Sequence, residues 1–141
     1  MTIRKAQATW SGSLREGAGE VALESGAFRG PYTFKARFEQ GAETNPEELL
    51  GAAHAGCFTM ALTALLARER LAPERIHTTA SVHLEQGGGG FVIPRIELTT
   101  RASIPGITPE RFAAIAADAK TNCPVSKALA GAEIVLDAAL D

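Results

Sequence analysis

Two cysteines, Cys57 and Cys123, are the residues of this sequence best suited to covalent chemistry, and they are its only cysteines. Three interpretations are open for them: a structural disulfide, two buried and inert thiols, or a redox pair. A structural disulfide is seldom kept in the cytosol. Cys123 precedes Pro124 at the start of a predicted short helix, and the positive end of a helix favours a thiolate. Cys57 lies in the middle of a longer predicted helix, so its ionisation would require a nearby cation.

Arg37 is the cation with the best position for that task. Within residues 32–38, however, apolar and polar residues alternate, which predicts a half-buried strand with Arg37 on its polar face. A solvated arginine is the simpler interpretation of that position. Glu47 and Glu48 compete as the partner that would orient the guanidinium. At about 100° per residue, Glu47 lies about 80° from Cys57 around the helix and Glu48 about 180°. Glu47 could therefore share a neighbourhood with Cys57, while the positive helix N-terminus alone explains Glu48.

Other chemistries have less support from the residue types. His54 shares a helix face with Cys57, but a Cys/His metal site needs three or four ligands, and no Asp or His residues cluster around either cysteine. His77 and His83 lie on one face of a predicted strand. The Gly-x-Ser-x-Gly string of many serine hydrolases is absent. We therefore expect thiol chemistry that uses no metal, flavin or haem.

The elements that must position these residues show both strand and helix patterns. Asn45, Pro46 and Glu47 are typical of a helix start. The four glycines at residues 87–90 predict a flexible hairpin tip. The predicted strands cover residues 3–10, 20–24, 32–38, 76–85, 91–104 and 133–136, and the predicted helices cover residues 45–70, 123–130 and a segment that begins at residue 108. The order is βββ-α-ββ-α-α-β, which is an α+β fold.

The long helix at residues 45–70 is apolar nearly all round. Its apolar run, residues 51–66, is interrupted by polar residues and is shorter than the roughly 20 residues of a membrane span, so we expect no membrane insertion. Gly51 and Gly56 in the helix interior indicate a close approach by another element, because glycine is otherwise costly there. A helix that is apolar on all sides must be covered on all sides. One short chain can hardly do this alone, so we expect a partner subunit.

Length and composition predict one soluble domain over residues 1–141. The chain has 45% hydrophobic and 21% charged residues and a formal net charge of -2, which excludes a disordered protein. It lacks the clustered positive charge that nucleic-acid binding requires. No apolar run follows the basic residues near the start, so we expect no secretory signal and a location in the reducing cytoplasm.

Three strings of residues resemble the OsmC/Ohr family of small thiol-dependent peroxidases. They are residues 45–49 (Asn-Pro-Glu-Glu-Leu), 53–58 (Ala-His-Ala-Gly-Cys-Phe) and 123–129 (Cys-Pro-Val-Ser-Lys-Ala-Leu). The second and third strings are similar to the OsmC branch rather than to the organic hydroperoxide resistance (Ohr) branch. The resemblance covers essentially the whole chain in length and element order.

The resemblance implies a role for each candidate residue. Cys57 would be the peroxidatic thiolate and Cys123 the resolving thiol, with Arg37 as the active-site arginine and Glu47 as the glutamate that holds it. This conflicts with the helix-end argument, which makes Cys123 the more acidic thiol. We follow the resemblance, because a guanidinium is a full charge and a helix end offers about half of one. The resemblance also implies an intertwined homodimer in which antiparallel sheets wrap two long central helices and both active sites lie at the subunit interface.

The expected activity is therefore reduction of organic hydroperoxides, and less well of hydrogen peroxide, to alcohols in oxidative or osmotic stress defence. The route would run through a sulfenic acid and an intramolecular disulfide, which an external dithiol, with a lipoyl group as one candidate, would reduce. Two other functions stay open: a thiol redox sensor, and a binding module for small apolar ligands that uses the same interface pocket.

Overall fold

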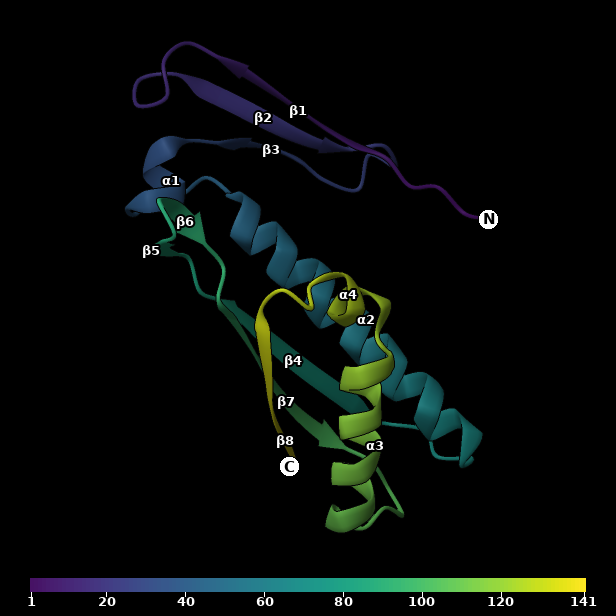
Figure 1. The fold of residues 1–141 in the computed structure, drawn as a ribbon. Helices are drawn as coiled ribbons and strands as arrows, with labels where there is room; N and C mark the ends of the chain where they lie inside the picture. The colour runs from purple at the N-terminus through teal and green to yellow at the C-terminus, as the bar shows by residue number, and fades with distance from the viewer. The chain divides into compact units, whose positions relative to one another are not determined.

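Eight strands and four helices follow one another in the order β1-β2-β3-α1-α2-β4-β5-β6-β7-α3-α4-β8 (Figure 1). The computed structural model describes all residues, 1–141, and their contacts divide the chain into a first unit, Met1–Leu49, and a second unit, Leu50–Asp141. This content confirms the predicted α+β class. The prediction of a single domain stays a prediction.

The first unit is a three-stranded antiparallel sheet followed by a short helix. Strands β1 (Ala6–Ser11), β2 (Ala18–Leu23) and β3 (Arg29–Tyr32) pair in sequence order, and helix α1 is Phe34–Phe38. In this register, Gly19 stands between Trp10 and Tyr32 on the neighbouring strands. The two rings meet edge to face with centroids 5.3 Å apart. A Cβ at Gly19 would lie 2.4 Å from the Tyr32 ring, so the ring contact requires glycine there.

The predicted strand over residues 32–38 is wrong beyond Tyr32, because Phe34–Phe38 forms helix α1. The Thr33 side chain caps this helix by accepting a hydrogen bond from the Ala36 amide at 3.1 Å. Phe34 and Phe38 are one helical turn apart, and their ring centroids lie 4.9 Å from each other. This spacing of four residues satisfies both a strand period of two and a helical turn, so alternation alone could not separate the two structures.

The second unit is built on a three-stranded sheet. Strands β4 (Arg75–Val82), β7 (Arg95–Ser103) and β8 (Glu133–Leu140) pair in the order β4-β7-β8. The β4–β7 pair is antiparallel, but the β7–β8 pair is parallel, so this sheet is mixed rather than wholly antiparallel as expected. The reason is the connection between β7 and β8, which contains helices α3 (Pro109–Asn122) and α4 (Pro124–Ala128) and so can return the chain in the same direction.

The predicted strand over residues 91–104 is interrupted. Strands β5 (Glu85–Gly87) and β6 (Gly90–Val92) form a small hairpin, and β7 begins only after Pro94. Pro94 has no amide hydrogen to donate to a sheet, which favours a break at this point. Gly88 and Gly89 have φ values of +61° and +84°, a conformation that favours glycine, and this confirms the predicted hairpin tip.

Helix α2 (Pro46–Arg68) is the longest element, and one of its faces lies in the core of the second unit. Phe58, Leu62 and Leu66 of α2 are fully buried in a cluster with apolar residues of β7 and α3. Gly51 lies against β4, where a Cβ would meet the Ala80 carbonyl oxygen at 3.4 Å, while a Cβ at Gly56 would meet no atom of another element within 4 Å. The close approach predicted for the two glycines is therefore present at Gly51 within the chain.

The opposite face of α2 is exposed in the single chain. Its exposed residues, most of them small, are Ala52, Ala53, Gly56, Met60, Thr63, Ala64 and Ala67, and Met60 has a relative exposure of 75%. By length and composition alone the helix could also cross a membrane, and 28% of its apolar window is buried. The core helix of a soluble protein passes the same test, so this is weak evidence.

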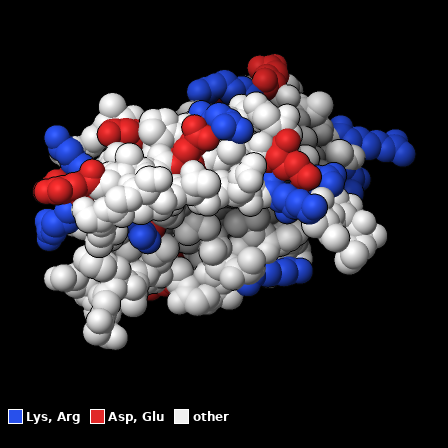
Figure 2. Space-filling model, turned by 90° about the horizontal axis from the view of Figure 1, so that it is seen from above, with Lys and Arg blue, Asp and Glu red and all other residues white.

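Charged side chains are mixed on the surface. On the face shown in Figure 2, Lys and Arg side chains lie among Asp and Glu side chains, with uncharged atoms between them. No continuous patch of one sign is visible on that face.

Candidate active site

The two cysteines are neighbours in the second unit although they come from different elements. Cys57 lies in the middle of α2 and is partly exposed, and Cys123 lies between α3 and α4 and is fully buried. Both are free thiols, and they lie close enough for each side chain to shift the pKa of the other. The structure therefore brings the two sulfurs together, as the redox-pair interpretation required.

The position of Cys123 follows from the local sequence. Its amide donates to the Ala119 carbonyl at 2.9 Å and so ends α3, and the next residue, Pro124, begins α4 with no amide of its own to satisfy. The Cys123 Sγ accepts a hydrogen bond from the Ser126 amide at 3.5 Å, as an N-cap side chain does. The Val125 amide hydrogen-bonds to both cysteine side chains. Backbone donors of α4 therefore point toward the sulfurs.

These neighbours shift the pKa values of the two thiols in opposite directions. Burial raises the pKa of Cys57, and its hydrogen bond to Cys123 and the charge of Cys123 raise it further, against the Val125 amide. Burial also opposes ionisation of Cys123, but hydrogen bonds from Cys57, Ser126 and Val125 outweigh it and lower the pKa of Cys123. Within this unit Cys123 is the more acidic thiol, as its place at the start of α4 predicted.

His54 and Ser126 adjoin the cysteine pair, although the sequence did not predict either of them as a site residue. His54 is fully buried on α2, and its Nε2 lies 2.7 Å from the Ser126 Oγ on α4. The Ser126 side chain also hydrogen-bonds to Cys123. The sequence contained part of the evidence for these two residues, because His54 shares a helix face with Cys57 and Ser126 belongs to the string that begins at Cys123. Periodicity could not show that the two side chains meet.

Arg37 and Glu47 form an ion pair in the first unit. The Arg37 Nε lies 3.0 Å from Glu47 Oε1, and its Nη2 lies 3.1 Å from Oε2. This two-point geometry fixes the plane of the guanidinium and leaves Nη1 to donate elsewhere. The Arg37 side chain is 38% exposed and lies beside the Phe38 ring, 5.2 Å from its centroid. Arg37 is thus a paired and oriented arginine rather than the freely solvated one that a strand would present.

The start of α2 holds Glu47 in place. Asn45 caps the helix by accepting from the Glu48 amide at 2.8 Å, which confirms the predicted helix start. Its side-chain amide donates to the Ala36 carbonyl of α1 at 3.0 Å, so α1 is tied to the first turn of α2. Glu48 accepts from the Thr44 hydroxyl at 2.9 Å and is thereby turned to a different partner. Of the two competing glutamates, Glu47 is the one that binds Arg37.

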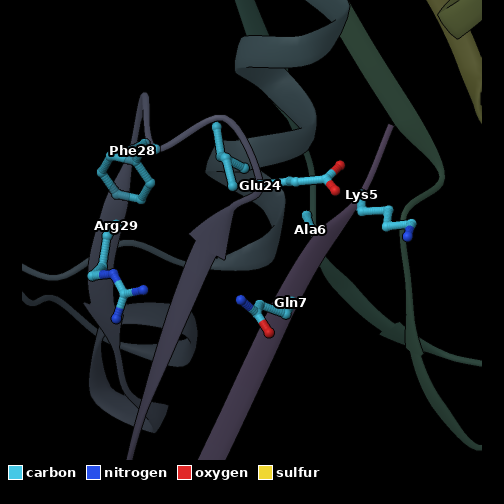
Figure 3. Close-up of a pocket in the computed structure, with 8 residues that line it drawn as sticks. Lys5, Ala6, Gln7, Glu24, Phe28 and Arg29 are labelled. Atoms are coloured by element: carbon cyan, nitrogen blue, oxygen red, sulfur yellow. The ribbon is translucent and has the colours of Figure 1, made fainter. Parts of the chain in front are cut away.

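A pocket of about 420 Å³ lies beside Arg37 in the first unit. Its lining is largely aromatic and apolar and consists of Trp10, Gly12, Leu14, Tyr32, Thr33, Phe34, Arg37 and Phe38. A second pocket, of about 460 Å³, lies at the end of the sheet, where Phe28, Glu24 and Arg29 line it together with Lys5 (Figure 3). This second pocket contains no thiol and no candidate residue. The first pocket is the one that could bind an apolar group next to a cation.

The predicted residues thus lie in two pairs, Arg37 with Glu47 in the first unit and Cys57 with Cys123 in the second. No group of three or more His, Cys, Asp or Glu side chains is arranged to hold a metal ion. The chemistry available to these residues is that of a thiol pair and an oriented guanidinium.

Comparisons with known proteins show the family to which the chain belongs. The family model for OsmC-like proteins matches residues 39–138. Peroxiredoxin OsmC of Escherichia coli (strain K12) is 48% identical over 139 residues, which cover 97% of this chain and 96% of that protein. The organic hydroperoxide resistance protein of Xanthomonas axonopodis pv. citri (strain 306) is 36% identical over 92 residues, which cover 64% of this chain and 63% of that protein.

The fold is also similar to that of a solved structure. The crystal structure of an organic hydroperoxide resistance protein from Elizabethkingia anophelis is 27% identical, covers 99% of each chain and has a TM-score of 0.78. The resemblance noted in the sequence is confirmed, and the long match to the Escherichia coli protein agrees with the predicted branch. The chain belongs to the OsmC family.

Proposed function

We propose that this chain is a cysteine-based peroxidase that reduces organic hydroperoxides to alcohols, with Cys57 as the attacking thiolate and Cys123 as the resolving thiol. The observation that carries the proposal is the pair of free thiols, which lie far apart in the sequence but close enough in the structure to shift each other's pKa. Relatives named peroxiredoxin OsmC and organic hydroperoxide resistance protein support the same activity. The sulfurs of such a pair can be oxidised in turn and then joined.

In the first step, the Cys57 thiolate attacks the distal oxygen of the hydroperoxide. A sulfur–oxygen bond forms, the oxygen–oxygen bond breaks, and the departing alkoxide takes a proton to become the alcohol. The peroxide gains two electrons, and Cys57 is left as a sulfenic acid.

In the second step, Cys123 attacks the Cys57 sulfur. The disulfide forms as the sulfur–oxygen bond breaks, and hydroxide leaves and is protonated to water. An external dithiol, with a lipoyl group as one candidate, then reduces the disulfide by thiol exchange and is itself oxidised. Formation of the disulfide protects Cys57 from irreversible oxidation by further peroxide.

Arg37 is proposed to activate Cys57, and Glu47 to orient Arg37. The surroundings of Cys57 in its own unit raise its pKa, so ionisation at neutral pH calls for a positive charge from elsewhere. A guanidinium keeps its charge at any physiological pH. The two hydrogen bonds to Glu47 support this role, because they hold the guanidinium in one orientation with Nη1 left to donate. That donor could also stabilise charge that develops on the peroxide oxygens.

The aromatic pocket beside Arg37 supports a preference for organic hydroperoxides over hydrogen peroxide. An apolar substituent gains binding free energy from the rings that line this pocket, and hydrogen peroxide has no such group. We further propose a homodimer that covers the exposed face of α2, and a location in the reducing cytoplasm, where free thiols persist.

Steady-state and single-turnover kinetics of two variants test the proposal. With cumene hydroperoxide and a dithiol, Cys57→Ser should abolish dithiol-dependent peroxide reduction. Cys123→Ser should reduce about one equivalent of peroxide and then lose activity through over-oxidation of Cys57. The opposite phenotypes would exchange the two roles. Activity that survives in Cys57→Ser would refute the proposed mechanism.

A further inference from the structure

His54 presents its two ring nitrogens to different surroundings. Nε2 lies 2.7 Å from the Ser126 hydroxyl oxygen, whereas Nδ1 is buried and has no hydrogen-bond partner. Burial lowers the pKa of His54, so the ring is neutral and carries one proton. A proton on Nδ1 would leave a buried N–H donor without an acceptor, which costs more than an unused lone pair. The proton therefore belongs on Nε2.

This tautomer determines what the Ser126 hydroxyl can do. Its oxygen accepts the Nε2 hydrogen of His54, so its own hydrogen is free for another acceptor. The acceptor at hand is the Cys123 sulfur, which already accepts from the Ser126 amide at 3.5 Å and whose pKa is lowered by the Ser126 side chain as well as by this amide. The hydrogen bonds therefore run in one direction, from His54 through Ser126 to the Cys123 sulfur.

We propose that His54 and Ser126 are positioning residues that hold Cys123 as the thiolate for the second, disulfide-forming step of the reaction. The step itself rests on the proposed function, but the chain of donors does not. When the Cys123 thiolate attacks the Cys57 sulfenic acid, the disulfide bond forms and the sulfur–oxygen bond breaks. The hydroxide that leaves takes a proton from solvent and becomes water.

A chain of neutral donors suits this buried sulfur. No charged side chain of the same unit contributes to the pKa shift of Cys123 or of His54; the groups that face Cys123 are Cys57, Ser126 and the Val125 amide. Hydrogen bonds to an ionised group are stronger than those between neutral groups, and they bring no second charge into the interior. His54 acts here only through Ser126, since Ser126 is its hydrogen-bond partner.

Titration of Cys123 tests the inference without any peroxide. In a Cys57→Ser background, the ultraviolet absorbance of the thiolate reports Cys123 alone. Ser126→Ala should lower the thiolate fraction about tenfold at a pH below the pKa, since a hydrogen bond to a charged group is worth about one pKa unit. His54→Leu should lower it by a smaller factor, because His54 acts only through Ser126. Ser126→Thr keeps the hydroxyl and His54→Gln keeps an N–H donor, so these two should restore much of the loss. The exposed-site controls Ser81→Ala and His77→Gln should leave the titration unchanged.

The double variant distinguishes an effect of His54 that passes through Ser126 from an independent packing effect of His54. If His54 acts through Ser126, adding His54→Leu to Ser126→Ala should cause no further loss of thiolate. An unchanged titration in Ser126→Ala would overturn the proposal, and a normal titration in His54→Leu would remove His54 from it. Nitrogen NMR of the unmodified protein tests the tautomer even if His54→Leu does not fold. The Nε2–H form is expected, and an Nδ1–H form would contradict the direction of the chain.

Kinetics connect the chain of donors to the reaction. After one equivalent of cumene hydroperoxide, the sulfenic acid of Ser126→Ala should persist about threefold longer, because the smaller thiolate fraction is partly offset by a more nucleophilic sulfur. Dimedone trapping measures that lifetime. A normal lifetime together with an altered titration would show that Cys123 is not the resolving thiol, which contradicts the proposed function and leaves the chain of donors intact. An altered lifetime with a normal titration would overturn the inference alone.

Discussion

Cys57 and Cys123 share a hydrogen bond, but the groups that control their ionisation are different. Neutral donors from α4 surround Cys123 and lower its pKa, whereas burial and the neighbouring Cys123 raise that of Cys57. In the proposed reaction Cys57 therefore depends on a cation from elsewhere, whereas Cys123 does not. This difference gives the two steps of the proposed reaction separate controls, Arg37 and Glu47 for the first and His54 and Ser126 for the second.

The Arg37–Glu47 pair gives a prediction at the scale of single residues. Glu47→Gln removes the carboxylate charge but keeps the size of the side chain, so the guanidinium should lose its fixed orientation. We expect kcat/KM for cumene hydroperoxide to fall by about 10-fold to 100-fold, a usual effect of misplacing a catalytic group. Glu20→Gln is the matched control, because it breaks an exposed ion pair with Arg29 in the same unit. Equal activity in the two variants would show that Glu47 does not position Arg37 for catalysis.

Helix α2 links the first unit to the second and places three of the proposed functional residues, Glu47, His54 and Cys57, along one element. It also supplies Phe58, Leu62 and Leu66 to the core of the second unit. These three side chains are therefore held by the same helix that contributes to the core of the second unit.

The buried face of α2 gives a prediction at the scale of elements. Leu62 is fully buried, and Leu62→Ala should lower the free energy of unfolding by about 2–5 kcal/mol because it removes core contacts and leaves a cavity. Leu14→Ala makes the same change at a residue with 64% exposure and should alter it by no more than about 0.5 kcal/mol. Urea denaturation at a fixed protein concentration measures both. A loss for Leu62→Ala no larger than that for Leu14→Ala would contradict this packing.

Local sequence patterns predict some elements and site residues of this protein but not others. Asn45 and its neighbours predict the start of α2, and the observed helix, Pro46–Arg68, matches the predicted residues 45–70 closely. Helix α1 was missed because Phe34 and Phe38 fit either period. In the site, residue types and motifs identified the cysteines, Arg37 and Glu47. The contact of His54 with Ser126 joins residues 72 positions apart, and no local pattern records such a contact.

The exposed face of α2 gives a prediction at the scale of the whole molecule. If a second copy covers this face, Met60→Asp would bury an unpaired charge and should dissociate the dimer. Sedimentation equilibrium should then give about twice 14.8 kDa for the unmodified chain and about 14.8 kDa for the variant. Ala72→Asp adds the same charge at an exposed loop position and should remain dimeric. A monomeric unmodified chain would refute the proposed assembly.

The most direct test of the redox pair is to locate the bond that peroxide forms. The fully reduced protein is treated with one equivalent of cumene hydroperoxide per chain, its thiols are counted, and its peptides are mapped by mass spectrometry without reduction. We predict that each chain loses two thiols and that the peptides of Cys57 and Cys123 from the same chain are joined by a disulfide. Two thiols per chain that survive the peroxide, or a bond that joins Cys57 of one chain to Cys57 of another, would contradict it.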